Sequence, residues 1–150
     1  MSKFFQFEAD FVDSLRCIPM QVRYKLDTCG VKLKLAHWNH FSQSERETLV
    51  EMPCNTDQEI ASYREFLHQL VLEKTGTQAN DLPIETHPAW IDTTNIPSQV
   101  QEKAQELGIN LSLEKWATLT TLERFALIKL SRSSHENANF LPAMKEFNLI

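Results

Sequence analysis

Hydrophobic residues recur at helical spacing in two separate parts of the chain. In each part, three apolar side chains follow the i, i+4, i+7 pattern that forms one stripe of an amphipathic helix. The two sets are Val22, Leu26 and Cys29 in the first part and Val100, Ala104 and Leu107 in the second. Gly30 and Gly108 follow these stripes directly, and glycine commonly ends a helix in the left-handed conformation. The pattern therefore predicts a helix that ends at each glycine.

The two parts also resemble each other residue by residue. A shift of 78 positions, which places Ile18 on Ile96, aligns them without a gap from Ile18 to Leu49. Identical pairs include Pro19 with Pro97, Lys25 with Lys103, Gly30 with Gly108, Trp38 with Trp116 and Arg46 with Arg124. The period is longer than that of solenoid repeats, so we interpret the chain as two copies of one unit.

We name residues 16–74 copy one, residues 75–93 the connecting loop and residues 94–150 copy two. The predicted fold class is mainly α, a compact helical domain built from two copies of a helix–Gly–extended segment–helix unit. The connecting loop has no helical period and contains Pro83 and Pro88. Each copy is near the size at which a core alone is marginal. Residues 1–150 are therefore expected to form a single domain.

Short extended segments are expected after the two glycines. Apolar residues alternate with polar ones over 31–35 and 109–113, which is typical of a strand. Pairing of the two copies here would give a small two-stranded β element. In copy two, Ser112 has a second interpretation as the N-cap of a short helix carrying Trp116. Both tryptophans, Trp38 and Trp116, are shared by the copies and are expected to be buried in the fold.

Three capping boxes predict where later helices begin. They are Ser42 with Glu45, Thr56 with Glu59 and Thr120 with Glu123. Helices are expected to start near Gln43 and Thr121, and a longer one is expected to run from the second box to about Lys74. Copy two ends with a polar run over 131–139 and a short apolar helix through Phe147. For residues 1–15, extended and helical structure both stay open.

Composition narrows the classes of function. The chain has 150 residues, 42% hydrophobic residues and a formal net charge of −5, which disfavours general nucleic-acid binding because that depends on surplus Lys and Arg. No secretory signal and no apolar run of membrane-spanning length is present, so a cytoplasmic protein is expected. Its three cysteines are then expected to be free thiols.

A metal site is one candidate for chemistry. His37 and His40 would lie on one helical face, with Cys17 and Cys54 as further ligands. However, zinc sites usually contain closely spaced Cys pairs, and this chain has none. Cys29 aligns with Leu107, which favours a core position. Cys54 aligns with Arg132, which indicates a surface position. We expect no cofactor and keep the metal site as the alternative.

Catalytic motifs are absent from the sequence. Ser134, His135 and Glu136 are adjacent, but neighbours in sequence rarely form a catalytic triad, and no nucleophile-elbow motif is present. With three glycines in the chain, no phosphate-binding loop or dinucleotide fingerprint exists. The sequence therefore predicts a protein that is not an enzyme.

Charge distinguishes copy one from copy two. Residues 16–34 of copy one contain five basic residues and a single acidic one, Asp27. We call the five the basic cluster, and they are Arg16, Arg23, Lys25, Lys32 and Lys34. In copy two only Lys103 is basic at the matching positions, so the repeated fold does not require this charge. The cluster is either a solvated face or a docking surface for an acidic partner. Residues 130–140, including Arg132, are the unmatched polar segment of copy two.

Four stretches resemble the nitrate reductase-associated proteins of cyanobacteria. They are FFQFEADFVDSLRCIPMQVRYKLDTCGVKLKL, YREFLHQLVLEKTG, LERFALIKLSRSSHEN and NFLPAMKEFNL. The similarity covers nearly the whole chain, from Phe4 to Leu149. The resemblance implies a small accessory protein needed for active nitrate reductase, encoded near nitrate-assimilation and molybdenum-cofactor genes. It adds two stretches as candidates for partner binding, Arg16-Cys17-Ile18-Pro19 and His135-Glu136-Asn137.

The resulting hypothesis is a non-enzymatic factor that binds nitrate reductase and supports its assembly, its cofactor insertion or its coupling to an electron donor. The alternative is a small metal- or cofactor-carrying module that uses the Cys and His residues of copy one.

Overall fold

The computed structural model describes residues 4–12, 14–132 and 137–150. The chain divides into two compact units. Among the described residues, unit 1 contains Phe4 and 9–84, and unit 2 contains 5–8 and 85–150. Each unit is described separately, and the single domain stays a prediction. Within the described ranges, no helix is both long and apolar enough to cross a bilayer.

The fold is mainly helical, as the sequence predicts, with one small antiparallel sheet. Unit 1 holds α1 (Ala9–Val12), α2 (Met20–Cys29), β1 (Val31–Lys32), α3 (Leu35–Asn39), α4 (Gln43–Glu51), α5 (Asp57–Thr75) and β2 (Asn80–Asp81). Unit 2 holds the 3₁₀ helix η1 (Gln6–Glu8), α6 (Ser98–Glu106), α7 (Leu113–Thr118), α8 (Thr121–Arg132), the 3₁₀ helix η2 (Asn137–Asn139) and α9 (Phe140–Glu146).

Helix α2 has the stripe and the end that the sequence predicts. Its three stripe residues Val22, Leu26 and Cys29 are all buried. Gly30 ends the helix with a φ of 76° and donates its N–H to the Leu26 carbonyl at 2.9 Å. In this left-handed region a side chain costs energy, which favours glycine.

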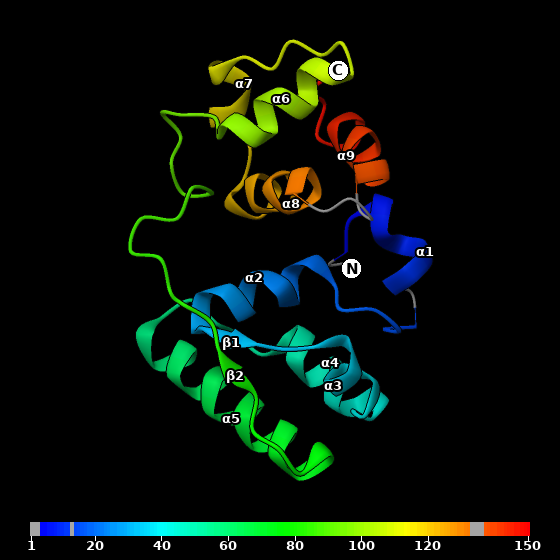
Figure 1. Ribbon diagram of the computed structural model, residues 1–150, viewed down its shortest axis with the longest axis vertical. Coiled ribbons are helices and arrows are strands. Elements are labelled where there is room, and N and C mark those ends of the chain that lie inside the picture. Colours follow the sequence, from blue (N-terminus) through cyan, green and yellow to red (C-terminus); the bar gives the residue numbers. More distant parts are fainter. Residues whose placement is uncertain (1–3, 13, 133–136) are drawn as a thin grey trace. The chain divides into compact units, whose positions relative to one another are not determined.

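The strand after Gly30 pairs with a segment of the connecting loop and not with copy two. β1 and β2 are antiparallel, with Val31 opposite Asp81, and Figure 1 shows them side by side near α2 and α5. A Cβ on Gly30 would lie 2.7 Å from Ile84 Cγ1 and 2.9 Å from the Leu82 carbonyl oxygen. Gly30 is therefore needed both for its backbone conformation and for this close approach.

The core of unit 1 forms around the long helix α5. Its buried residues are Tyr63, Leu67, Leu70 and Val71. Trp38 of α3 is also fully buried, as predicted, and its indole N–H donates to the Leu15 carbonyl at 2.7 Å. The capping boxes at Ser42 and Thr56 form as predicted, so the starts of α4 and α5 follow from local sequence.

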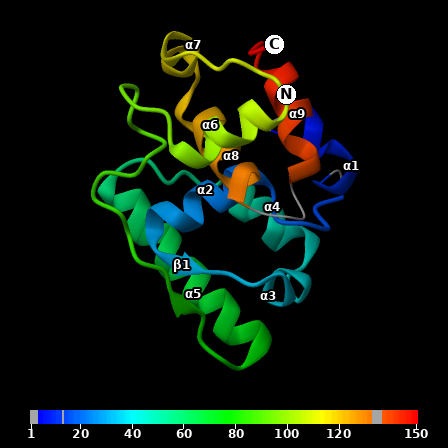
Figure 2. The same cartoon turned by 45° about the horizontal axis from the view of Figure 1, so that its top comes forward.

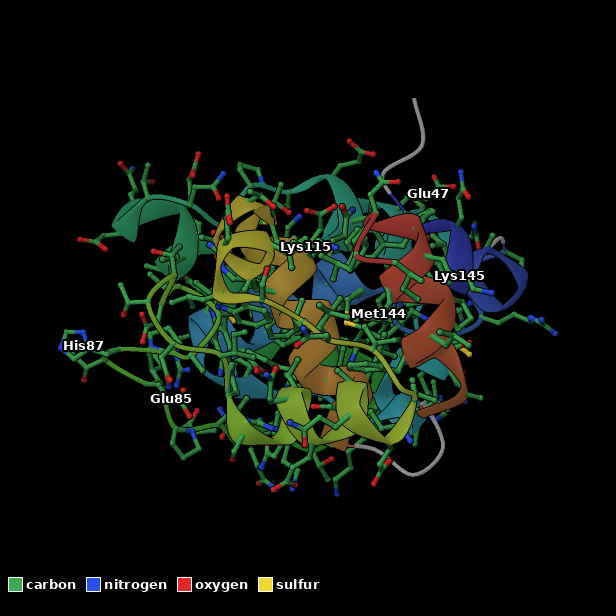
Figure 3. The ribbon with its side chains drawn as sticks, turned by 90° about the horizontal axis from the view of Figure 1, so that it is seen from above. Glu47, Glu85, His87, Lys115, Met144 and Lys145 are labelled. Carbon is green, nitrogen blue, oxygen red and sulfur yellow. The ribbon has the colours of Figure 1, made fainter. Side chains whose placement is uncertain are left out.

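Unit 2 is organised around α8, which packs against α6 and α9 (Figure 2). Trp116 is fully buried, as predicted. Ser112 caps α7, with its hydroxyl accepting the Lys115 N–H at 3.2 Å, so the capping interpretation is confirmed. Met144 of α9 is buried, whereas the side chains of Glu85 and His87 project outward from the segment before α6 (Figure 3).

The predicted burial of Leu107 is wrong. Leu107 is 38% exposed because α6 ends at Glu106, and Leu107 is the C-cap with a φ of −89° and a ψ of 4°. The chain therefore leaves the helix one residue before the predicted stripe is complete. Cys29, its counterpart, is still the last residue of α2 and points into the core.

Of the first fifteen residues, Gln6–Glu8 and Ala9–Val12 are helical. Phe5 and Phe7 lie against Phe147, with ring centroids 5.1 and 6.3 Å apart. The carboxylate of Glu146 accepts the backbone N–H of Gln6 at 3.0 Å and of Phe7 at 3.1 Å. The N-terminal segment is thus attached to α9 at the C-terminal end of the chain.

Element positions recur at the offset found in the sequence. Helices α2 and α6 begin at Met20 and Ser98, and each start is 78 positions from the other. The same offset separates the starts of α3 and α7 and of α4 and α8. Beyond these shared elements the copies differ, since the 19-residue α5 follows α4, whereas η2 and the 7-residue α9 follow α8.

Candidate functional site

The basic cluster of copy one separates into residues with different surroundings. Arg16 is exposed before α2, and Arg23 is half-buried on α2. The Lys25 ammonium donates to the carbonyls of Val50 and Met52, both at 2.7 Å. Since the last carbonyls of a helix have no partner within it, Lys25 closes the C-terminal end of α4.

The remaining two lysines lie on one edge of copy one. Lys32 and Lys34 are exposed, whereas Val31 is buried and Leu33 is half-buried. Because successive side chains alternate in extended backbone, both lysines project from the same side. We call Lys32, Lys34, Leu35, His37 and His40 the cationic edge. Residues 28–44 contain no Asp or Glu, so no carboxylate of this segment offsets the charge.

His37 is held by the backbone at this edge. Its Nδ1 accepts the N–H of Lys34 at 3.2 Å, which leaves the proton of the neutral ring on Nε2. Burial lowers the pKa of His37, and the positive charges of Lys34 and His40 lower it further. His37 is therefore neutral at pH 7 and adds no charge to the edge.

Of the three thiols of copy one, Cys29 and Cys54 are buried and Cys17 is half-buried. Cys54 is buried beside the Lys25 carbonyl, so its predicted surface position is wrong. Burial raises the pKa of Cys54 to about 11 and that of Cys29 to about 12. Since the thiolate is the form that attacks electrophiles and binds metals, both sulfurs are protonated and inert at neutral pH.

No metal-binding constellation is seen in residues 4–12, 14–132 and 137–150. Across these ranges the structure brings together no group of three His, Cys, Asp or Glu side chains that would hold a metal ion. Of the four proposed ligands, Cys54 is buried and His37 already uses Nδ1 as an acceptor. The metal-carrying alternative stays a prediction.

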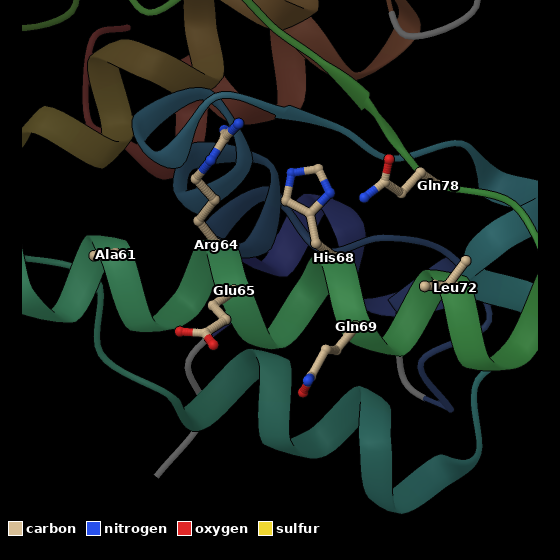
Figure 4. A pocket seen from close by; sticks show the side chains of 7 residues that line it. All are labelled: Ala61, Arg64, Glu65, His68, Gln69, Leu72 and Gln78. Atoms are coloured by element: carbon tan, nitrogen blue, oxygen red, sulfur yellow. The ribbon is translucent and has the colours of Figure 1, made fainter.

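A hollow of about 350 Å³ lies along α5, and sequence reasoning missed it. Arg64 and His68 point to the same side of the helix, and the Gln78 amide is directed toward them (Figure 4). Arg64 donates to Asp81 Oδ1 at 2.6 Å and to the carbonyls of Cys29 and Gly30 at 2.9 and 3.0 Å. This guanidinium thereby joins α5 to the end of α2 and to β2.

His68 completes the polar group in this hollow. Its Nε2 is 3.6 Å from Asp81 Oδ1, which is too long for a hydrogen bond. Both ring nitrogens are buried without a hydrogen-bond partner among the described residues. Arg64 and His68 are spaced i, i+4, which the sequence reveals, but Asp81 comes from a segment predicted to be loop. The group holds the connecting segment on α5, which is a structural task.

The candidates of copy two are only partly described. Arg132 is exposed at the end of α8, and its Nε donates to Gln99 Oε1 at 3.2 Å. Asn137 opens η2. His135 and Glu136 lie outside the described residues, so their candidacy as partner-binding residues stays a prediction.

Comparison with known proteins identifies one family. No curated protein and no solved structure matches the chain. The sequence pattern of the family described as conserved nitrate reductase-associated protein matches residues 4–147. This range includes all the helices of both copies and the cationic edge. The chain therefore belongs to the conserved nitrate reductase-associated protein family.

Proposed function

We propose that this protein is a non-enzymatic accessory factor that binds nitrate reductase and supports its activity. The observation that carries the proposal is the family match over residues 4–147. The supported step is assembly of the enzyme, insertion of its molybdopterin-type cofactor or iron–sulfur cluster, or coupling to its electron donor. The expected place of action is the cytoplasm.

The surface of copy one supports binding through a protein interface. Residues 16–34 carry five Lys and Arg side chains against the single carboxylate of Asp27, although the whole chain carries a net charge of −5. Local excess charge speeds and orients protein encounters. The two buried thiols, with raised pKa values, are unsuited to covalent catalysis, which agrees with a binding role.

Association and dependence on the gene test the proposal together. Tagged protein is expected to co-purify with nitrate reductase, and cells lacking the gene are expected to lose nitrate reductase activity. Re-expression of the wild-type chain controls for effects on neighbouring genes. Full activity without the gene, combined with no association, would refute the proposal.

Measurements on the enzyme from deletion cells separate the three steps. A failure of assembly lowers the amount of nitrate reductase protein. A failure of insertion leaves the protein present but lowers its content of molybdenum or iron. A failure of donor coupling leaves both intact and preserves activity with an artificial low-potential electron donor.

A further inference from the structure

Helix α3 begins with a residue that does not cap it. The N-cap residues Ser42, Thr56 and Ser112 of other helices each accept an N–H of the first turn with a side-chain oxygen, at 3.1 to 3.2 Å. Lys34 occupies the N-cap of α3 and makes no such side-chain bond. Its ammonium has donors only, so a lysine at this position leaves an N–H of the helix uncapped.

The duplication supplies a direct comparison for this position. Lys34 in copy one corresponds to Ser112 in copy two, and helices α3 and α7 begin at the equivalent residues Leu35 and Leu113. Replacing a serine cap lowers helix stability, and a positive charge near a helix N-terminus is unfavourable as well. Copy one therefore carries a residue that its own fold disfavours, and such local violations are expected at functional sites.

The surroundings of Lys34 fit an anionic protein surface. Lys32 and Lys34 project from the same side of the backbone, and within the described residues neither ammonium is engaged in an ion pair. Leu35 follows them with half of its surface exposed. At the matching positions copy two has Asn110 and Ser112. An exposed leucine is thus present in both copies, and the lysines are present only in copy one.

We propose that Lys32, Lys34 and Leu35 bind a surface of nitrate reductase that is rich in carboxylates and also offers an apolar contact. Lys34 occupies the N-cap of α3 because this binding requires its charge, although a lysine there lowers the stability of the helix. The inference rests on the proposed function and names the contact chemistry. The binding groups are the lysine side chains and the leucine, and the helix end contributes only the stability cost. Charge pairs at a solvated rim weaken with added salt.

Two reciprocal substitutions in the full chain test the inference. Lys34→Ser restores a cap and is expected to raise Tm by about 2–4 °C while weakening binding to purified nitrate reductase about two- to fivefold at low salt. Ser112→Lys is the matched control, expected to lower Tm by a similar amount without changing binding. Lys34→Arg keeps the charge and is expected to keep binding. Leu35→Ser is expected to weaken binding, and Leu113→Ser is not.

The outcomes distinguish this inference from the proposed function. If the wild-type chain binds and Lys34→Ser binds equally well, the docking edge is wrong and the accessory role stands. If Lys34→Ser fails to raise Tm, the claimed conflict between stability and binding is wrong. If the wild-type chain does not associate with nitrate reductase at all, the proposed function fails and the inference fails with it.

Discussion

Replacing Trp38 by phenylalanine and then by alanine separates two contributions to the stability of unit 1. The indole ring is fully buried, and its N–H donates to the Leu15 carbonyl at 2.7 Å. That carbonyl also accepts Arg46 Nη1 at 3.2 Å. The Phe41 ring meets the indole edge-on at 6.2 Å between centroids. Phenylalanine removes the N–H and part of the volume, and alanine removes the whole ring.

The structure sets the size of each step. Loss of one neutral hydrogen bond costs about 1 kcal/mol, and the Leu15 carbonyl keeps its bond from Arg46. With the smaller ring, we expect Trp38→Phe to cost about 1–3 kcal/mol. Trp38→Ala leaves a cavity in the core and is expected to cost about 3–5 kcal/mol. Against a total stability of about 5–15 kcal/mol, the alanine variant is near the limit of folding.

Urea denaturation followed by far-ultraviolet circular dichroism measures both steps, because it does not depend on tryptophan fluorescence. Trp116→Phe and Trp116→Ala are the matched controls in copy two, where the indole donates to the Asp92 carbonyl at 3.0 Å. A cost below about 1.5 kcal/mol for Trp38→Ala would contradict a fully buried ring. Equal costs for the two Trp38 variants would show that ring volume contributes nothing, which the described packing forbids.

Three further predictions use single residues. Gly30→Ala is expected to destabilise more than Gly108→Ala in thermal denaturation, because both residues have positive φ but only a Cβ at Gly30 meets other atoms; equal shifts would refute the close packing. Alkylation of the native protein at pH 8 is expected to label Cys17 and to spare Cys29 and Cys54, which are buried and protonated. Mass spectrometry counts the labelled thiols, and rapid labelling of all three would contradict the burial of Cys29 and Cys54. Hydrogen bonds from the backbone N–H groups of Thr56 and Asn55 lower the pKa of Glu59. The stability that ionised Glu59 contributes is therefore full above its unfolded pKa of about 4.3 and is lost as pH falls through its folded pKa. Tm is expected to fall less steeply with acid in Glu59→Gln than in the wild type, and parallel plots of Tm against pH for the two proteins would show that Glu59 is not the cause.

Local signals were sufficient to predict most helices. The stripe of α2 and the capping boxes of α4 and α5 are encoded within one or two turns, so a sequence window contains the needed information. The β1–β2 pairing depends on contacts between Gly30 and residues after α5. Nothing in the exposed pair Asn80–Asp81 distinguishes a strand from a loop.

The two errors in burial have a common cause. Equivalence between copies was assumed beyond the shared helices. Cys54 follows the end of α4 at Glu51, whereas its aligned partner Arg132 is still within α8. Likewise α6 ends one residue earlier than α2 relative to its glycine. A residue's exposure depends on the element that carries it, so the alignment could not transfer it.

The candidate site was visible only in part. The sequence shows the excess of basic residues within 16–34, but Lys25 cannot be separated from Lys32 and Lys34 without its contacts to α4. The missing cap at Lys34 was hidden because alternation over 31–35 predicted an extended segment in place of a helix start. Arg64 and His68 gain their roles from Asp81, which comes from another element.

The hydrogen bonds of Gln6 and Phe7 to Glu146 of α9 determine what happens when a protease cuts the connecting loop. Glu85 and His87 project outward (Figure 3) and residues 85–87 are exposed, which makes these three residues a natural target for a protease. A nick there would leave Phe5–Glu8 on the N-terminal fragment, yet these residues belong to unit 2 and are bonded to Glu146. The fragments should therefore stay together on gel filtration. Residues 85–150 expressed alone would therefore lack Phe5–Glu8 and would not form a complete unit 2.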